Sequence, residues 1–397
     1  MFQWERFGQG EMAEAEAKWA DAADFATRGG VAVRMVLGGR ARRSRVVVAA
    51  GSAVNSETSK RSRPRRVLRV VGRVIAGIVA VAVIAVAVSA GFHRWQTPRD
   101  KAAIEEAIGP VHRYVEVDGH RMSVAVQGSG PRTIVLMPGL GTPEPILGFA
   151  PLARRLAEKN TVVTVEYFGL GLSDGTDAPR TSEAIVTETR AALRGLGLNG
   201  PYVLMPHSIS GLYSTWWATH RPDEVAAVVG LDDERYTSEG AQGDPDWPGW
   251  MSTVTSVGGI RDLLALDKRT DYLGLVADYR ESLGDAAEYT PDQQDRYLGA
   301  YSWVLNPTML DEVARGAENV RAAEGAVFPP TLPVLSILAA SSLELEPEWE
   351  PSHHATISNP AIQQVTILDG HHYLFHAQAA TIAALTERFL DDHVEAP

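Results

Sequence analysis

Residues 201–212 read PYVLMPHSISGL, an apolar run that ends in a turn with Ser208 at its apex. The run is typical of a buried strand, and residues 212–219 after the turn predict a helix. A serine on a tight strand-to-helix turn projects its hydroxyl from the sheet, near the positive end of the helix that follows. We therefore interpret Ser208 as a candidate nucleophile and test that interpretation on the rest of the chain.

The usual form of this turn is Gly-x-Ser-x-Gly. Pro206 stands at the first glycine position and Ser210 at the second, with Gly211 one residue later. Because proline fixes φ and removes an N–H, we expect the turn to differ in detail from the usual one. An ordinary loop serine could carry the same short motif, so the order of the surrounding elements has to decide.

Composition and charge limit the classes of function. A chain of 397 residues with 45% apolar content is sufficient for one large domain with appendages. The lack of cysteine excludes disulfides, thiol catalysis and zinc–thiolate sites. Residues 1–92 contain 15 Lys and Arg against 7 Asp and Glu, whereas residues 93–397 contain 22 against 42. The acidic larger part argues against nucleic acid as a partner.

The N-terminal third predicts a membrane anchor. Residues 1–66 show no core-forming pattern, so we expect a disordered basic segment or an extension upstream of the true start of translation. Residues 74–92 carry no charge and, as a helix, would cross the roughly 30 Å of a bilayer. We predict a transmembrane helix over residues 67–92, because a buried core helix seldom lacks a polar face for this length.

The basic residues around this helix predict its orientation. Those before it are Lys60, Arg61, Arg63, Arg65, Arg66, Arg69 and Arg73, and those just after it are Arg94, Arg99 and Lys101. This excess predicts a single-pass protein of the cell membrane with a cytoplasmic N-terminus and an extracytoplasmic body. Secretion after signal cleavage is the alternative, since residues 85–87 and 88–90 have the small-residue pattern of a cleavage site.

Strands and helices alternate in the remaining chain, after a linker over residues 93–112. Residues 113–127 predict a hairpin with a two-residue turn at Asp118 and Gly119. Further strands are expected at residues 133–137, 161–165, 202–205, 225–231, 334–338 and 364–368. Since helices separate most of them, we predict an α/β fold with a mostly parallel, doubly wound sheet that is covered on both faces.

Several motifs resemble, in their order, those of the α/β-hydrolase superfamily. Residues 138–141 (PGLG) look like its oxyanion loop, and residues 169–173 (GLGLS) look like the loop after the next strand. Residues 207–211 look like its nucleophile elbow. The resemblance covers about residues 113–391 and implies no cofactor. The segment 169–171 lacks the third glycine and the helix start of a dinucleotide fingerprint.

The resemblance also implies a domain organisation. Residues 113–234 would form the first part of the hydrolase core and residues 331–397 the second part. Residues 235–330, which contain helix-like stretches at 260–266, 272–283, 291–304 and 308–323, would form a helical cap over the site. A separate all-helical domain is disfavoured because the strand pattern resumes at residue 333.

In this superfamily a histidine in the turn after the last strand acts as the catalytic base. The sequence after residue 368 contains His371, His372 and His376. His372, which Tyr373 and Leu374 follow, is our candidate, and His371 is the alternative. We expect no metal here, because no carboxylate accompanies the histidines at a spacing typical of metal ligands.

The acid departs from the usual pattern. The turn after the strand at 334–338 contains no carboxylate before Glu344. The preceding strand ends in Gly-Leu-Asp at residues 230–232, which resembles the strand end that supplies the acid in pancreatic-type lipases. We therefore favour Asp232, with Asp233 and Glu344 as alternatives. A purely structural carboxylate at the start of the cap is the competing interpretation of Asp232.

The resemblance thus implies a Ser208–His372–Asp232 triad, with the N–H groups of Leu140 and Ile209 as the oxyanion hole. It implies a carboxylesterase or lipase acting on a small-molecule ester. A serine at the elbow argues against haloalkane dehalogenases and epoxide hydrolases, which place an aspartate there. The alternatives are a peptidase or amidase with the same chemistry, and a non-catalytic binding protein that retains the fold. Nothing in the sequence indicates the oligomeric state.

Overall fold

The computed structural model describes residues 63–243, 249–270 and 288–395. The chain divides into two units, residues 1–78 and 79–397, which we describe separately. Residues 1–62 of the expected disordered segment, and the whole of the helix expected at 272–283, lie outside the described residues. The described part of the first unit is the beginning of helix α2 (Arg63–Ile108).

In the described part of the chain, one helix is long and apolar enough to cross a membrane, and it is α2. The helix continues through residues 93–108, where we expected a linker with only a short helix, and Pro98 does not end it. The continuation belongs to the second unit and makes contacts within it. Ile104 is only 1% exposed in an apolar cluster, and the Ser89 hydroxyl donates to the carbonyl oxygen of Val257 at 2.8 Å.

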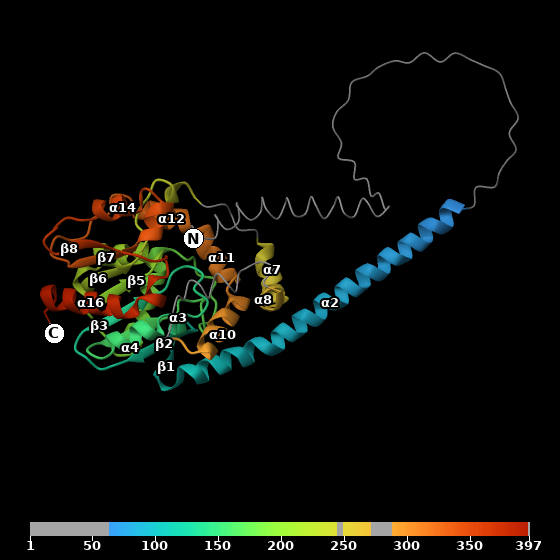
Figure 1. The fold of residues 1–397 in the computed structure, drawn as a ribbon, viewed down its shortest axis with the longest axis horizontal. Coiled ribbons are helices and arrows are strands. Elements are labelled where there is room, and N and C mark those ends of the chain that lie inside the picture. Colours follow the sequence, from blue (N-terminus) through green and yellow to red (C-terminus); the bar gives the residue numbers. More distant parts are fainter. Residues whose placement is uncertain (1–62, 244–248, 271–287, 396–397) are drawn as a thin grey trace, which may run out of the picture. The chain divides into compact units, whose positions relative to one another are not determined.

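The second unit contains an eight-stranded sheet (Figure 1). Its strands are β1 (His112–Val117), β2 (His120–Gln127), β3 (Thr133–Met137), β4 (Thr161–Val165), β5 (Tyr202–Pro206), β6 (Val225–Leu231), β7 (Val334–Ala339) and β8 (Gln363–Leu368). The spatial order is β1-β2-β4-β3-β5-β6-β7-β8, in which β2 pairs antiparallel with β1 and β4 and the other pairs are parallel. The predicted α/β class with a mostly parallel sheet is confirmed.

Helices cover both faces of the sheet. One face packs against α5 (Ser182–Gly195) and α6 (Ser210–His220), and the other packs against α4 (Ala150–Leu156) and α16 (Ala379–His393). Leu204 of β5 contributes to the first apolar cluster and its neighbour Met205 to the second, because successive side chains of a strand point to opposite faces. Every residue of β5 is consequently buried, which explains its unbroken apolar run.

The chain between β6 and β7, residues 235–330, is here called the insertion. Its described residues form helices and turns and contain no strand. The helices are α7 (Trp250–Ser256), α8 (Gly259–Thr270), α10 (Pro291–Ala300), α11 (Pro307–Ala314) and α12 (Gly316–Ala322), with 3-10 turns at Gly240–Gln242 and Tyr301–Trp303. Helices α7, α8, α10 and α11 lie together to the right of the sheet in Figure 1. The single helix expected over residues 308–323 is two helices, separated at Arg315.

Short helices occupy several loops of the sheet. They are α3 (Pro145–Gly148), α13 (Ala340–Leu345), α14 (Trp349–Ala355) and α15 (Leu374–Ala377), with 3-10 turns at Gly109–Val111 and Pro222–Glu224. Helices α13 and α14 follow β7, and α15 follows β8, so all three begin at the carboxyl ends of parallel strands. In open α/β sheets this is the edge at which ligands bind.

Candidate active site

Ser208 lies in the turn between β5 and α6, at the carboxyl edge of the sheet. Its φ is 54°, a left-handed conformation that non-glycine residues adopt uncommonly, and its side chain is buried. Such a strained strand-to-helix turn exposes a serine hydroxyl at the top of a sheet in nucleophile elbows. The local backbone therefore has the form that the sequence of this stretch predicts.

The departures from the Gly-x-Ser-x-Gly pattern have a structural explanation. The Ser210 hydroxyl donates to the carbonyl oxygen of Pro138 and lies 2.9 Å from the Tyr167 hydroxyl, so it ties the elbow to the 138–141 loop. A Cβ on Gly211 would overlap the backbone oxygen of Glu234. The position that requires glycine has thus moved one residue along the chain.

The 138–141 loop lies directly against the elbow. A Cβ on Gly139 would stand 2.8 Å from the Cβ of Ser208. Within the described residues, the backbone N–H groups of Leu140 and Ile209 donate to no protein acceptor. Both groups are therefore free to donate to a ligand next to Ser208, as oxyanion donors must be.

The structure brings His372 and Asp232 together. Nδ1 of His372, in the turn after β8, lies 2.7 Å from Oδ2 of Asp232, in the turn after β6. The carboxylate is fully buried, whereas the imidazole is 13% exposed. In the described part of the chain no hydrogen bond joins His372 to the Ser208 hydroxyl. Such bonds are often long in unliganded enzymes and shorten when substrate binds.

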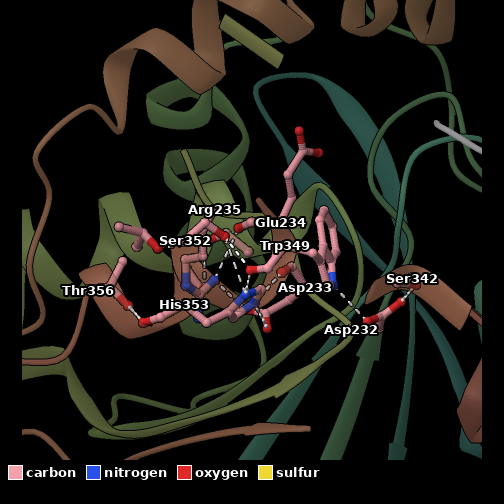
Figure 2. Close-up of polar contacts among 12 residues, drawn as sticks. Asp232, Asp233, Glu234, Arg235, Ser342, Trp349, Ser352, His353 and Thr356 are labelled. Carbon is pink, nitrogen blue, oxygen red and sulfur yellow. Dashed lines mark hydrogen bonds and ion pairs between the residues drawn. The ribbon is translucent and has the colours of Figure 1, made fainter. Parts of the chain in front are cut away.

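Each carboxylate oxygen of Asp232 has two hydrogen-bond partners among the described residues. Oδ1 accepts hydrogen bonds from the Ala339 N–H and from Nε1 of Trp349, each at 2.9 Å. Oδ2 accepts from the Ser342 hydroxyl (Figure 2) and also lies next to Nδ1 of His372. Ala339 is the last residue of β7 and Ser342 lies in α13, which begins directly after β7. The resemblance to the superfamily places the acid after this strand. In this chain the end of β7 and α13 instead supply hydrogen-bond donors to a carboxylate that follows β6.

The alternative candidates for the acid and the base have surroundings different from those of the Asp232–His372 pair. Asp233 is buried beside Arg235, with which it forms an ion pair. Burial raises the pKa of Asp233, but the Arg235 charge and the nearby His353 outweigh this and lower it. Glu344 on α13 and His371 are exposed. Among the described residues, no side-chain hydrogen bond joins His372 or Ser208 to any of the three alternatives, Asp233, Glu344 and His371.

Sequence reasoning missed the residues that support the His372–Asp232 pair. Trp349 and Ser342 donate to Asp232, the candidate acid, and the only signal for them was the serine-rich segment without a carboxylate after β7. His207 was missed as well. Its Nε2 lies 3.2 Å from the carbonyl oxygen of His372, and burial, together with the neighbouring His372, holds its pKa well below its usual value. A neutral His207 therefore donates from Nε2 to the backbone of the base.

A buried carboxyl group follows the 138–141 loop. Glu144 caps the N-terminus of α3 by accepting a hydrogen bond from the Leu147 N–H, and its side chain is fully buried. Burial and the neighbouring carboxylate of Glu166 raise its pKa well above the usual 4.5, more than Leu147 and Lys101 lower it. The folded state therefore favours a protonated Glu144.

We predict that Glu144→Gln stabilises the protein above pH ~5 and has little effect at lower pH. A carboxyl with a raised pKa contributes its full stability below the usual value of 4.5 and loses it as the pH rises through the folded-state value. Glutamine keeps the acceptor for Leu147 without ionising, so a gain of about 1 kcal/mol is expected. Melting temperatures between pH 4 and pH 9 test this; a difference that does not grow with pH contradicts it.

The strand order, the serine elbow after β5 and the histidine turn after β8 define an α/β-hydrolase fold. No family model matches the chain. Among curated proteins, the uncharacterized protein YbdG of Bacillus subtilis is 33% identical over 167 residues, 42% of this chain and 49% of that protein. The 2-(acetamidomethylene)succinate hydrolase of Mesorhizobium japonicum is 28% identical over 126 residues, 32% of this chain and 44% of that protein. The chain thus spans about half the length, or less, of these relatives.

Solved structures share the fold at low sequence identity. The epoxide hydrolase VrEH1 from Vigna radiata superimposes with a TM-score of 0.52 at 16% identity, covering 71% of this chain and 97% of that chain. Cfl2 from Burkholderia cenocepacia superimposes with a TM-score of 0.51 at 20% identity, covering 72% of this chain and 95% of that chain. These similarities confirm the predicted α/β-hydrolase fold.

Proposed function

We propose that the protein is a serine hydrolase that cleaves carboxylic esters through an acyl-enzyme intermediate. The observation that carries the proposal is the 2.7 Å hydrogen bond between His372 and the buried Asp232, beside a serine elbow with a φ of 54°. This arrangement supplies a nucleophile, a base and a carboxylate that orients the base. The elbow residue is not a carboxylate, so the proposed nucleophile is a hydroxyl.

In the proposed mechanism, Oγ of Ser208 attacks the ester carbonyl while Nε2 of His372 takes the hydroxyl proton. The carboxylate of Asp232 holds the Nδ1–H tautomer and stabilises the imidazolium that forms. The N–H groups of Leu140 and Ile209 bind the oxyanion, a contribution of about 3 kcal/mol for each donor. When the C–O bond breaks, His372 returns the proton to the leaving alcohol. Water, deprotonated by His372, then attacks the acyl-serine; as the bond to Oγ of Ser208 breaks, His372 returns the proton to Oγ and the acid is released.

Amide hydrolysis is the second candidate, and one comparison favours it. The Mesorhizobium relative is by name a hydrolase of an acetamidomethylene compound. The same three side chains would cleave an amide, with His372 protonating a leaving amine instead of an alcohol. Parallel assays with p-nitrophenyl acetate and p-nitroacetanilide separate the candidates, because the two substrates carry the same acyl group.

We also propose that α2 anchors the protein in the cell membrane, with residues before it in the cytoplasm and the hydrolase core outside. Its length, its apolar run and the basic residues that precede the run support this orientation. Protease added to intact cells should digest the core and spare a tag at the N-terminus. A soluble, shortened product in the medium would instead support secretion after signal cleavage.

The experiment that tests the proposed chemistry is covalent labelling of the full chain with a fluorophosphonate probe. Such probes react with serine hydroxyls that a neighbouring base activates. We expect one label per chain, located at Ser208 by peptide mass spectrometry and absent from Ser208→Ala. Ser210→Ala is a matched control, since Ser210 lies two residues away and donates to a backbone oxygen. A folded native chain that takes up no probe, or takes it up elsewhere, would contradict the proposal.

A further inference from the structure

We propose that Trp349 is a positioning residue for the candidate acid, and that helix α14 holds it in place. Its indole N–H would fix the Asp232 carboxylate in the orientation that presents Oδ2 to His372. This inference rests on the proposed function and adds to it a residue of α14 that neither the motifs nor the comparisons indicate.

The two carboxylate oxygens of Asp232 accept hydrogen bonds from different donors. Within the part of the chain that the structure describes, Oδ1 accepts from the Ala339 N–H and the Trp349 indole, and Oδ2 accepts from Ser342 and His372. An indole N–H is a donor only, so it pairs with a carboxylate oxygen and never with another donor. Trp349 thus holds one end of the carboxylate and leaves the other end to the base.

The backbone at Asp232 explains why outside support is needed. Its φ is 45°, a left-handed conformation that is uncommon for a residue other than glycine. Strained residues persist only where the surrounding structure determines them. The three donors other than His372 come from the end of β7 and from the helices after it, and β7 is the strand that pairs with β6, the strand before Asp232.

His353 fixes Trp349 in turn. Nδ1 of His353 lies 2.8 Å from the carbonyl oxygen of Trp349, and its Nε2 lies 2.7 Å from the carbonyl oxygen of Asp233. The imidazole ring therefore lies between the backbones of Trp349 and Asp233 and contacts both. The Asp233 carboxylate lies 3.4 Å from Nε2 of the same ring.

These contacts close a ring of interactions around the acid (Figure 2). Starting from Asp232, the ring passes through the Trp349 indole, the Trp349 carbonyl and His353 to Asp233, which is bonded covalently to Asp232. Trp349 is 8% exposed and His353 is 1% exposed, so water does not compete for these groups. Helix α14 is therefore bound both to the acid and to the residue after it.

Trp349→Phe tests the inference, because it removes the N–H and retains an aromatic ring. Trp303→Phe is the matched control: Trp303 is also 8% exposed, and its indole nitrogen has no hydrogen-bond partner in the described residues. With p-nitrophenyl acetate, we expect Trp349→Phe to lower kcat about tenfold and to leave KM within twofold. We expect Trp303→Phe to leave both values within twofold.

The pH profile distinguishes positioning from general structural support. A carboxylate that no longer holds its orientation stabilises the His372 imidazolium less, so the acid limb of kcat/KM should move to lower pH in Trp349→Phe, by up to about one unit. If the acid limb of kcat/KM does not move in Trp349→Phe, the proposal is overturned, whether kcat falls or not. Equal kinetics for Trp349→Phe and Trp303→Phe would overturn it as well.

A spectroscopic readout keeps this inference separable from the proposed function. The Nδ1 proton of His372, bonded to Asp232, should give a downfield proton NMR signal in the full chain, assigned by its loss in His372→Gln. We expect Trp349→Phe to shift this signal and Trp303→Phe to leave it in place. A signal that is unchanged in Trp349→Phe, or absent from the native chain, overturns the positioning role. A native chain with this signal that takes up no fluorophosphonate overturns only the hydrolase proposal.

Discussion

Asp232→Asn should lower kcat/KM for ester hydrolysis by about four orders of magnitude. The amide can still accept from Trp349 and Ala339 through its oxygen, so its NH2 group would face His372 in place of Oδ2. Nδ1 of His372 must then accept a hydrogen bond, which leaves the ring proton on Nε2. A base in that tautomer cannot take the proton of Ser208. Initial rates with p-nitrophenyl acetate and rates of fluorophosphonate labelling measure the loss.

The two other candidate acids provide the controls. Glu344→Gln changes an exposed side chain on α13 and should leave kcat/KM within about twofold. Asp233→Asn, assayed at a temperature where it is folded, should retain far more activity than Asp232→Asn. A chain in which Asp232→Asn stays active while either control loses activity would show that another carboxylate serves the base.

Asp233→Asn should instead lower the free energy of unfolding by about 3–5 kcal/mol. Asp233 is fully buried and Arg235 is 1% exposed, so the substitution leaves the guanidinium of Arg235 without its carboxylate partner in the interior. His353, whose ring nitrogens both face carbonyl oxygens, loses the same negative charge. Urea unfolding of the full chain in detergent measures the difference.

A double replacement and the pH dependence test the cause of this loss. Asp233→Asn combined with Arg235→Met removes the unpaired charge and should recover part of the stability lost in the single variant. Because the folded-state pKa of Asp233 is lowered from 3.8, its contribution is present above that value and is lost as the pH falls through the folded-state pKa. The native chain should therefore lose more stability in acid than Asp233→Asn. Equal acid sensitivity of the two would exclude the ion pair as the cause.

The sheet could be predicted from the sequence because the strands of a parallel sheet covered on both faces consist of nearly continuous apolar residues. The strands expected at residues 161–165 and 225–231 have those bounds in the structure. The serine turn was recognisable because a strand end, a serine at the apex, small neighbouring residues and a helix start all fall within a few consecutive residues. The pairing of Asp232 with His372 was implied by the resemblance to the α/β-hydrolase superfamily, in which the acid and the base come from turns that follow strands of one parallel sheet.

Other features depend on contacts between distant residues and leave no local pattern. Trp349 lies more than one hundred residues beyond Asp232, and nothing in its neighbourhood in the sequence marks it as a donor to that carboxylate. The continuation of α2 past Pro98 depends on the burial of Ile104 in the second unit, which overrides the local tendency of proline to end a helix. The separation of α11 from α12 at Arg315 was equally invisible in the periodicity.

The position of the candidate acid on β6 has a consequence for how such a chain could diversify. Ser208 and Asp232 lie on one unbroken stretch from β5 to the turn after β6, and the insertion begins only after both. In the sequence, the insertion thus separates His372 from Ser208 and Asp232, but it does not separate Ser208 from Asp232. Recombination at two junctions, after residue 234 and before residue 331, would exchange the whole insertion as a module and leave every candidate catalytic residue in its original polypeptide context.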